Sequence, residues 1–354
     1  MPDLTIPTDA PVLVTGATGY VAGRVVERLL QEGLTVHATV RDASKTERLQ
    51  YLNDLADGNP GTLRFFSADL LTPGSFAEAM EGCSVVFHIA SPFIRDAADP
   101  QKDLIDPAVN GTTNVLTSVN GTESVRRVVL TSSCAAIYGD NIDVAATPRG
   151  MLDEDVWNTT ATLDHNPYFL SKTLAEREAW KLADAQDRWR LVTINPSMVM
   201  GPGVKVHGSS ESFHLLKQLV DGSLGTGMPD LGMGVVDVRE VAEAHVRAAF
   251  LPDAEGRHIL SAHDSGLPQM VEALRPTWGS SFKLPPRIVP KWLLWLVAPF
   301  VGLTRTYVSK NVGHPWKADH SKSVERLGIQ YRPLPDTMND FMEQLVEAGA
   351  LTPS

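Results

Sequence analysis

Short, almost continuous apolar runs alternate with amphipathic stretches through the first two-thirds of the chain. Runs without strict apolar–polar alternation are typical of parallel strands covered by helices on both faces. One amphipathic stretch, Val21–Gln31, repeats apolar residues at helical spacing between two such runs. This alternation predicts an α/β fold, a Rossmann-type doubly wound parallel sheet. The predicted strands are Pro11–Thr15, Thr35–Val40, Leu63–Ser67, Val85–Ala90, Val128–Ser132 and Leu191–Asn195.

The composition of the sequence changes after about Met200, where Gly and Pro become frequent and strand-like runs become fewer. We expect a smaller C-terminal lobe that builds a pocket at the carboxyl edge of the sheet, whereas the unit 234–250 is expected to return to the main domain. The predicted main domain is therefore 1–199 with about 234–262. The lobe is about 200–233 with 263–354.

The most apolar run, Trp292–Leu303, is too short to span a bilayer and contains Pro299, so a buried helix or pocket lid is expected there. The 354 residues are 43% hydrophobic and 21% charged, as in an ordinary globular protein. A net charge of −11 argues against nucleic acid or an anionic membrane as a partner. Cys83 and Cys134 lie in apolar contexts without metal-ligand spacing, which favours buried free thiols and no metal. The N-terminus lacks the features of a secretory signal, so a cytoplasmic location is expected.

A glycine-containing turn follows the first predicted strand and opens a helix. Its spacing, G-x-x-G-x-x-A from Gly16 to Ala22, is a compressed form of the dinucleotide-binding turn. Gly16 permits the tight turn, and Gly19 lets the backbone approach a pyrophosphate at the helix N-terminus. The alternative is an ordinary tight strand–helix turn. The residues predicted to bind the cofactor here are Thr15, Gly16, Thr18, Gly19, Tyr20 and Val21.

The end of the second predicted strand selects between NAD and NADPH. An NAD site usually offers Asp or Glu about 20 residues past the turn, to bind the ribose 2′-OH. Here Arg41 occupies that position, with Lys45 and Arg48 close behind. Cations suit a 2′-phosphate, for which a planar guanidinium is a good partner. We therefore expect NADPH rather than NADH. The alternatives are that these are solvated charges on a helix start, or that Asp42 binds the ribose.

The ends of the following strands extend this groove. Asp69 and Leu70 follow the third strand, where a side chain can bind an adenine amino group. Small residues follow the fourth strand, and Thr131 ends the fifth. Because the carboxyl ends of parallel strands meet at one edge, these segments predict a continuous cofactor groove. The small residues after the fourth strand are Ala90, Ser91 and Pro92.

Three residues near this groove predict proton transfer: Ser133, Tyr168 and Lys172. Tyr168 and Lys172 form the only Tyr-x-x-x-Lys match among the 6 tyrosines. Asn166 is expected to cap the helix and Pro167 to open it, which places the Tyr and Lys side chains on one face. A nearby ammonium is expected to lower the pKa of the phenol, and a serine hydroxyl can hold a carbonyl oxygen. Taken singly, each has a structural alternative: a turn-forming Ser, an amphipathic Tyr at a helix start and a solvated Lys.

These motifs resemble the extended short-chain dehydrogenase/reductases, and most of all the branch that holds dihydroflavonol reductases, cinnamoyl-CoA reductases and NADPH-dependent aldehyde and ketone reductases. The resemblance runs over nearly the whole chain, through TGATGYVAG, HIASPF, VVLTSS, YFLSKTLAEREAW and INPSMVMGPG to DHSKSVERLGIQYRPL. It implies a Ser133, Tyr168 and Lys172 triad, with Pro196 and Ser197 at the nicotinamide. Tyr138 stands where dihydroflavonol reductases offer an asparagine, which speaks against a flavonoid substrate. The fourth catalytic asparagine of many relatives has no secure counterpart, although Asn110 and Asn114 are nearby.

The function expected from these features is an NADPH-dependent reduction of an aldehyde or ketone to an alcohol in a largely apolar pocket. The candidate walls of that pocket are Phe93, Tyr138, Met198 and Val204. Two alternatives stay open: a nucleotide-sugar epimerase or dehydratase of the same fold, and a regulatory protein that binds the cofactor without catalysis. The oligomeric state is also open, with a homodimer as one alternative.

Overall fold

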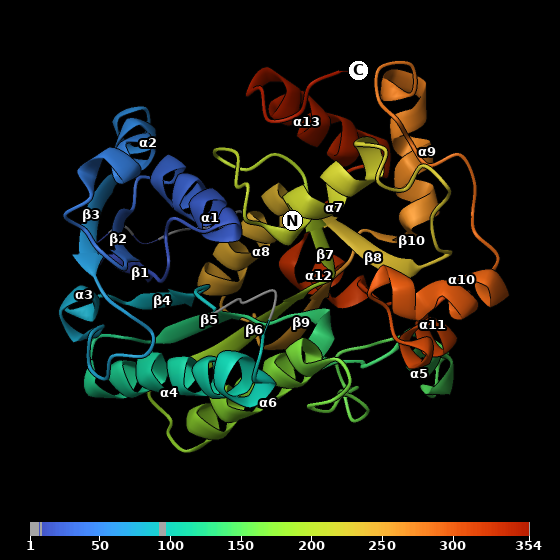
Figure 1. Cartoon of the computed structure of the whole chain (residues 1–354). Helices are drawn as coiled ribbons and strands as arrows, with labels where there is room; N and C mark the ends of the chain where they lie inside the picture. The colour runs from blue at the N-terminus through green and yellow to red at the C-terminus, as the bar shows by residue number, and fades with distance from the viewer. Residues whose placement is uncertain (1–6, 8, 92–96, 354) are drawn as a thin grey trace.

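Seven parallel strands form the central sheet of the computed structural model, in the order β3-β2-β1-β4-β5-β6-β9 (Figure 1). The structure describes residues 7, 9–91 and 97–353. The strands are β1 (Val12–Val14), β2 (Thr35–Val40), β3 (Thr62–Ser67), β4 (Val85–His88), β5 (Arg127–Thr131), β6 (Arg190–Pro196) and β9 (Gly256–Leu260). The first six confirm the predicted strands and the predicted fold class. The strand order reverses between β1 and β4, which is where such sheets open a ligand crevice.

Helices cover both faces of this sheet, which explains why most of its strands are largely apolar. Val12 and Val14 pack into one core, and Leu13 between them packs into the other. The first core includes α1 (Tyr20–Gln31), α2 (Thr46–Asp57), α8 (Val238–Phe250) and α12 (Ser321–Leu327). The second includes α3 (Ala77–Met80), α4 (Asp106–Gly121) and α6 (Pro167–Asp184).

A second sheet of three strands, in the order β10-β8-β7, lies in the C-terminal lobe. Its strands are β7 (Met198–Met200), β8 (Gly232–Asp237) and β10 (His263–Gly266). The lobe has its own apolar core, to which α7 (Glu211–Val220), α9 (Leu267–Trp278) and α13 (Leu334–Glu347) contribute. The unit 234–250 is divided: β8 joins the lobe sheet, whereas α8 returns to cover the main sheet.

The apolar run 292–303 forms α10 (Lys291–Val297) and the short helix η3 (Ala298–Val301), beside α11 (Arg305–Asn311) at the edge of the molecule (Figure 1). The prediction of a buried helix is correct for one face of this segment and wrong for the other. Leu294 and Ala298 are buried, but Trp292 is 66% and Phe300 88% exposed. Within the described residues, no helix is both long and apolar enough to cross a membrane. The remaining short helices are η1 (Gln101–Ile105), η2 (Cys134–Ala136) and α5 (Asn141–Ala146).

Candidate active site

The glycine turn after β1 is held against the neighbouring strand ends. Gly16 has φ +64°, and a Cβ at this position would lie 2.9 Å from Ala90 Cβ. Its N–H donates to Thr39 Oγ1 at 3.2 Å. Thr15 Oγ1 accepts from the backbone N–H groups of Ile89 and Ala90 at 3.0 and 2.9 Å. The turn therefore requires glycine on both conformational and steric grounds.

The first turn of α1 follows the glycine turn, and no side chain caps its N–H groups. Gly19 stands at the N-cap with no side chain, and its own N–H donates to Gly16 O at 2.9 Å. The Tyr20 side chain turns away to the lobe, where its hydroxyl donates to Gly201 O at 2.5 Å. Any contact of Tyr20 with a pyrophosphate at this turn would therefore come from its backbone. The exposed Thr18 and the half-buried Val21 flank the same turn.

The three cations after β2 are exposed on the surface: Arg41 directly follows β2, Lys45 is the N-cap of α2 and Arg48 lies in its first turn. Lys45 pairs with Asp42 at 3.3 Å, and among the described residues Arg41 and Arg48 form no ion pair. Asp42 also accepts hydrogen bonds from the side chain and backbone of Ser44, and these bonds lower the pKa of its carboxyl. The carboxylate is thus already engaged in its own turn, which weakens the alternative that Asp42 binds a ribose.

The loop after β3 is fixed by a residue whose role the sequence did not reveal. Asn114 Nδ2 donates to Leu70 O at 3.0 Å and to Thr72 O at 2.7 Å, and its Oδ1 accepts from Gly74 N–H at 3.0 Å. Asp69 Oδ1 accepts from Leu71 N–H at 2.8 Å. Asn114 therefore positions the Asp69–Leu70 segment from α4.

A small cavity brings several of the predicted cofactor residues together. Leu70, Ala90, Ser91, Thr131 and Lys172 all line it, although they follow different strands or lie on α6. Pro92 and Phe93 were predicted for the same groove and lie outside the described residues. The ends of β3, β4 and β5 therefore meet at one edge of the sheet, as predicted.

Pro196 and Ser197 stand at the end of β6, where the backbone N–H of Ser197 donates to Leu260 O at 2.9 Å. The Ser197 hydroxyl is buried and has no hydrogen-bond partner among the described residues. A buried hydroxyl left without a partner is costly, so this one fits a ligand that offers a polar group.

The three proton-transfer residues come together at the start of α6. Tyr168 is the second residue of this helix, after Pro167, and its phenol hydrogen-bonds the Ser133 hydroxyl. Ser133 Oγ also accepts from Ala135 N–H at 3.1 Å, which fixes its side chain at the start of η2. Lys172 Nζ donates to Ser91 Oγ at 3.1 Å. The Lys172 side chain thus reaches from α6, the helix that also carries Tyr168, to the groove at the end of β4.

The pKa values of this pair differ from the prediction. Burial raises the pKa of Tyr168 to about 12, although its hydrogen bond with Ser133 lowers it and the Glu211 carboxylate raises it further. The pKa of Tyr168 is therefore raised where the spacing predicted that it would be lowered, because burial is the largest influence on it. Burial lowers the pKa of Lys172 to about 8, and the charge of Glu176 opposes this shift. At pH 7 the phenol is protonated and the amine is mostly an ammonium.

Comparison with known proteins places these features in a family. The family model of the NAD dependent epimerase/dehydratase family matches residues 12–260. The chain belongs to this family. The resemblance to the extended short-chain dehydrogenase/reductases is thereby confirmed.

Individual relatives cover nearly the whole chain. A cinnamoyl-CoA reductase of Medicago truncatula is 37% identical over 95% of both chains. A tetraketide alpha-pyrone reductase of Arabidopsis thaliana is 34% identical over 96% of this chain and 97% of its own length. Among solved structures, Gre2 of Candida albicans in complex with NADPH has a TM-score of 0.76, with 28% identity over 96% of this chain and 99% of that chain.

A buried carboxylate lies one helical turn after Lys172. Glu176 is 1% exposed and accepts from Arg257 Nε at 2.7 Å and from Asn195 Nδ2 at 2.8 Å, as well as from Ser132 Oγ. Arg257 in turn donates to the carbonyl of Val156 at 2.6 Å. The sequence analysis missed this network. The only signal was the spacing Tyr168, Lys172, Glu176, which puts all three on one helix face.

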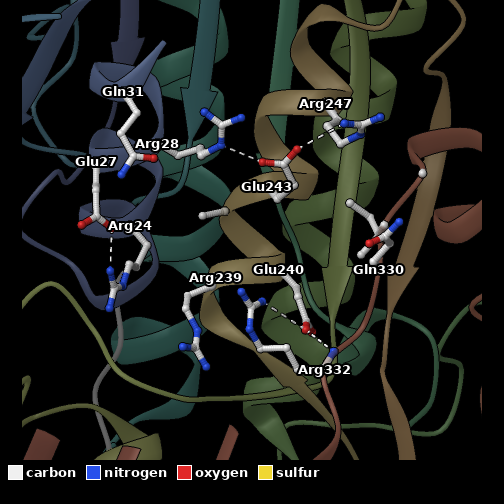
Figure 2. Close-up of a pocket in the computed structure, with 13 residues that line it drawn as sticks. Arg24, Glu27, Arg28, Gln31, Arg239, Glu240, Glu243, Arg247, Gln330 and Arg332 are labelled. Carbon is white, nitrogen blue, oxygen red and sulfur yellow. Dashed lines mark hydrogen bonds and ion pairs between the residues drawn. The ribbon is translucent and has the colours of Figure 1, made fainter. Parts of the chain in front are cut away.

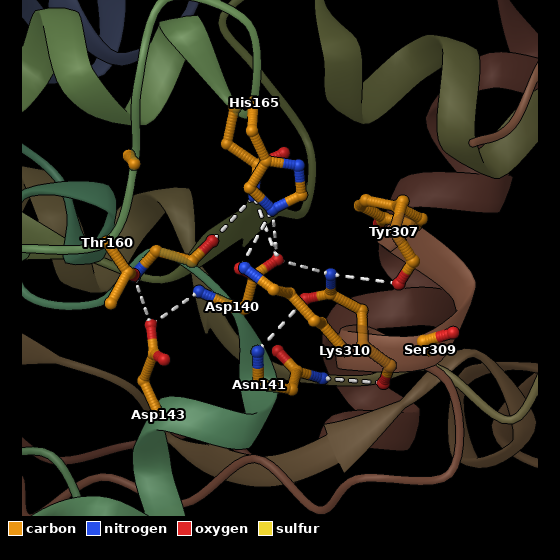
Figure 3. A network of polar contacts seen from close by, with 12 residues as sticks. Asp140, Asn141, Asp143, Thr160, His165, Tyr307, Ser309 and Lys310 are labelled. Carbon is orange, nitrogen blue, oxygen red and sulfur yellow. Dashed lines mark hydrogen bonds and ion pairs between the residues drawn. The ribbon is translucent and has the colours of Figure 1, made fainter. Parts of the chain in front are cut away.

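The N-terminus of α6 is anchored to the lobe through Asp140 (Figure 3). His165 Nε2 lies 2.8 Å from both Asp140 carboxylate oxygens, and Lys310 Nζ of α11 lies 3.1 Å from one of them. Asn166 has φ 58° and makes no capping bond, so the predicted side-chain cap is wrong. Its Nδ2 donates instead to Gly139 O at 2.7 Å. The position of the Tyr168 helix therefore depends on contacts with two other segments.

The predicted pocket walls lie in different surroundings. Tyr138 packs edge-on against Phe169, which in turn packs edge-on against Tyr168, so it shares the aromatic cluster of the site. Met198 packs against the core of the lobe. Val204 lies against α1, where a Cβ on Gly23 would approach its Cγ2 to 2.7 Å. Of the three, Tyr138 lies in the same cluster as the triad, whereas a substrate-binding role for Met198 and Val204 stays a prediction.

A different pocket lies between α1, α8 and the segment 328–332, on the other face of the sheet from α6 (Figure 2). Several of its charged side chains form ion pairs: Arg28 contacts Glu243 at 2.7 Å, Arg24 contacts Glu27 at 2.6 Å and Arg247 also contacts Glu243. None of the predicted catalytic residues lines it. It is therefore not the candidate active site.

Proposed function

We propose that the protein is an NADPH-dependent carbonyl reductase that converts an aldehyde or ketone reversibly to an alcohol. The observation that carries this proposal is the pairing of the Ser133 and Tyr168 hydroxyls beside the cavity that Ser91 and Lys172 line. The reductase names of the relatives and the NADPH in the Gre2 structure support it. The chain's own carbonyl substrate is expected to be largely apolar or aromatic, since Phe169 packs against Tyr168 and Tyr138 packs against Phe169.

Several residues fit a bound NADPH. Gly16 leaves room that a Cβ would fill, the exposed Arg41 suits a 2′-phosphate, and the Ser197 hydroxyl is buried without a partner among the described residues. When bound, NADPH supplies the hydride that reduces the carbonyl carbon.

The chain itself would supply orientation and the proton. The Ser133 hydroxyl donates to the carbonyl oxygen and holds it in place as negative charge develops there. The Tyr168 phenol, which is protonated at neutral pH, transfers its proton to that oxygen and completes the alcohol. The Lys172 ammonium stabilises the phenolate that this transfer leaves behind. In the reverse direction the phenolate accepts the proton.

The decisive experiment replaces Tyr168 by Phe, which keeps the ring and removes the proton. We expect kcat/KM for NADPH-dependent reduction across a panel of aldehydes and ketones to fall by about 10²–10⁴-fold. NADPH binding, followed by its fluorescence, should change little. Tyr331→Phe is the matched control, because it removes a hydroxyl that bonds Ser323 at 2.7 Å, in another part of the molecule. Equal turnover in wild type and Tyr168→Phe would refute the proposal.

The two alternatives give different results in the same preparation. A nucleotide-sugar epimerase or dehydratase is favoured by the name of the matched family model, and tightly bound NAD in the purified protein would support it. A regulatory protein would bind NADPH with no Tyr168-dependent turnover of any carbonyl. Measuring bound cofactor by mass spectrometry therefore tests the epimerase or dehydratase alternative before any substrate is known, and the carbonyl panel tests the regulatory one.

A further inference from the structure

Exposed apolar side chains form a ridge on η3 and on α10, the helix that lies at the edge of the molecule in Figure 1. Its outermost side chains are Trp292, which is 66% exposed, and Phe300, which is 88% exposed. These residues are spaced at helical intervals, so their side chains share one face. Clustered exposure of this kind differs from the scattered apolar residues of an ordinary surface. The ridge comprises Trp292, Leu293, Leu296, Val297, Phe300 and Val301.

The ridge is fixed in this outward orientation by its opposite face. Leu294 and Ala298 are buried in a small core with Val308 and Val312 of the neighbouring segment. Trp295 is partly covered by the Arg305 guanidinium, which lies 4.4 Å above its ring. A helix that is apolar all round normally lies inside a core or in a membrane. Here only one side is covered by the chain.

The chain segment that contains the ridge carries only positive charges. Residues 279–317 carry six Lys and Arg and no Asp or Glu, in a chain whose net charge is −11. Lys291 lines a surface hollow with Trp292, Trp295 and Leu296. Among the described residues, only Lys310 of these six forms an ion pair, with Asp140. The six cations are Lys283, Arg287, Lys291, Arg305, Lys310 and Lys317.

We propose that the ridge docks the protein onto the surface of a phospholipid bilayer that carries anionic headgroups. Exposed Trp, Phe and Leu side chains enter the boundary between headgroups and acyl chains, and flanking cations bind the negative surface. A second copy of this chain is the competing occupant. A twofold contact through the ridge would bring two sets of cations together, which disfavours it. The net charge of −11 argued against a membrane, but it is a sum over the whole chain. It does not describe the segment 279–317, which carries only cations.

The test uses the full chain and sucrose-loaded vesicles of phosphatidylcholine with or without phosphatidylserine. Wild type should sediment with the phosphatidylserine vesicles, and salt should weaken this binding. Trp292→Asp with Phe300→Asp should lose more than about tenfold in vesicle affinity. Lys291→Glu and Arg305→Glu should each lose about fivefold or more. Val324→Asp is the control, since Val324 is a 41% exposed apolar residue on α12; it should bind like wild type.

A second measurement avoids dependence on the folding of the aspartate variants. Brominated phosphatidylcholine mixed into the same vesicles should quench the tryptophan fluorescence of wild type, and Trp292→Phe should reduce this quenching. Failure of wild type to bind anionic vesicles would overturn the proposal. Equal binding to neutral vesicles would also overturn it, as would a dimer in light scattering that becomes a monomer only in the Trp292→Asp, Phe300→Asp variant.

Discussion

The Glu176 carboxylate accepts a hydrogen bond from the Arg257 guanidinium at 2.7 Å, one helical turn after Lys172. This contact joins α6, which carries the proposed proton donor, to β9 at the edge of the central sheet. Both side chains are buried, with 0% and 7% exposure. The charge of Glu176 raises the pKa of Lys172 against the effect of burial. The pair therefore connects the position of the helix with the protonation of its lysine.

Replacing Glu176 by Gln should destabilise the protein and lower the pKa of Lys172. The Arg257 charge would remain buried without its partner, which costs about 3 kcal/mol in the free energy of unfolding. Loss of the negative charge near Lys172 should move the alkaline decline of activity to lower pH. Urea unfolding and a pH–rate profile measure the two effects.

Glu178→Gln is the control for this change, two residues away on the same helix. Glu178 pairs with Lys181, whose side chain is 73% exposed, so its loss should cost under about 0.5 kcal/mol. A Glu176→Gln enzyme with wild-type stability and an unchanged pH profile would contradict the role assigned to the pair.

Arg41→Ala should weaken the preference for NADPH over NADH. Arg41 is exposed and forms no ion pair among the described residues, so its guanidinium is available to a 2′-phosphate. Losing a charge-assisted contact of about 1.5–3 kcal/mol should raise KM for NADPH ten- to hundredfold. KM for NADH should hardly change. Arg326→Ala on α12, also an exposed arginine, is the control and should change neither value. Equal effects of Arg41→Ala on both cofactors would remove the 2′-phosphate assignment.

Most of the main strands could be predicted from the sequence because each is a local apolar run; β1, β2 and β4 are buried on both faces. β9 could not, because Arg257 and His258 interrupt its apolar pattern although both are buried; Arg257 is paired with Glu176, 81 residues earlier. The glycine turn was likewise predictable, because the positive φ of Gly16 leaves a glycine at a fixed place in the local spacing, although its contact with Ala90 was not visible there.

Local spacing was less informative about the energetics of the site. The Tyr168–Lys172 spacing placed both residues on one helix face, but it contained no measure of burial, and burial sets the direction of both pKa shifts. Asn is a residue type that often caps helices, yet the Asn166 side chain donates to the carbonyl of Gly139, 27 residues earlier. Local spacing did not reveal the partners of Asn114 and Glu176, because each contacts a segment that only the fold brings near.

The alkaline limb of activity should belong to Lys172. Burial raises the pKa of Tyr168 to about 12, so the phenol stays protonated throughout the usual assay range. The pKa of Lys172 is lowered to about 8, so the ammonium is lost as pH rises through that value. We expect kcat/KM for reduction to be level near pH 6–7 and to fall above about pH 8. Lys172→Arg retains a cation and should remove this limb from whatever activity remains. Persistence of the limb in that variant would assign it to another group.

Buried neutral histidines should make the protein less stable in acid. His245 is fully buried between Val241 O at 2.7 Å and Thr131 Oγ1 at 2.6 Å, and burial lowers its pKa to about 4. The unfolded chain binds a proton near pH 6.5 and the folded chain does not, so this contribution is complete above pH 6.5 and is lost as pH falls toward 4. At pH 5 the loss is on the order of 2 kcal/mol for this one group.

His245→Gln should therefore reduce the difference in unfolding free energy between pH 7 and pH 5, measured by urea titration. His320→Gln, a half-buried histidine beside α12, should leave that difference as in wild type. An unchanged difference in His245→Gln would show that this histidine does not contribute to the acid sensitivity.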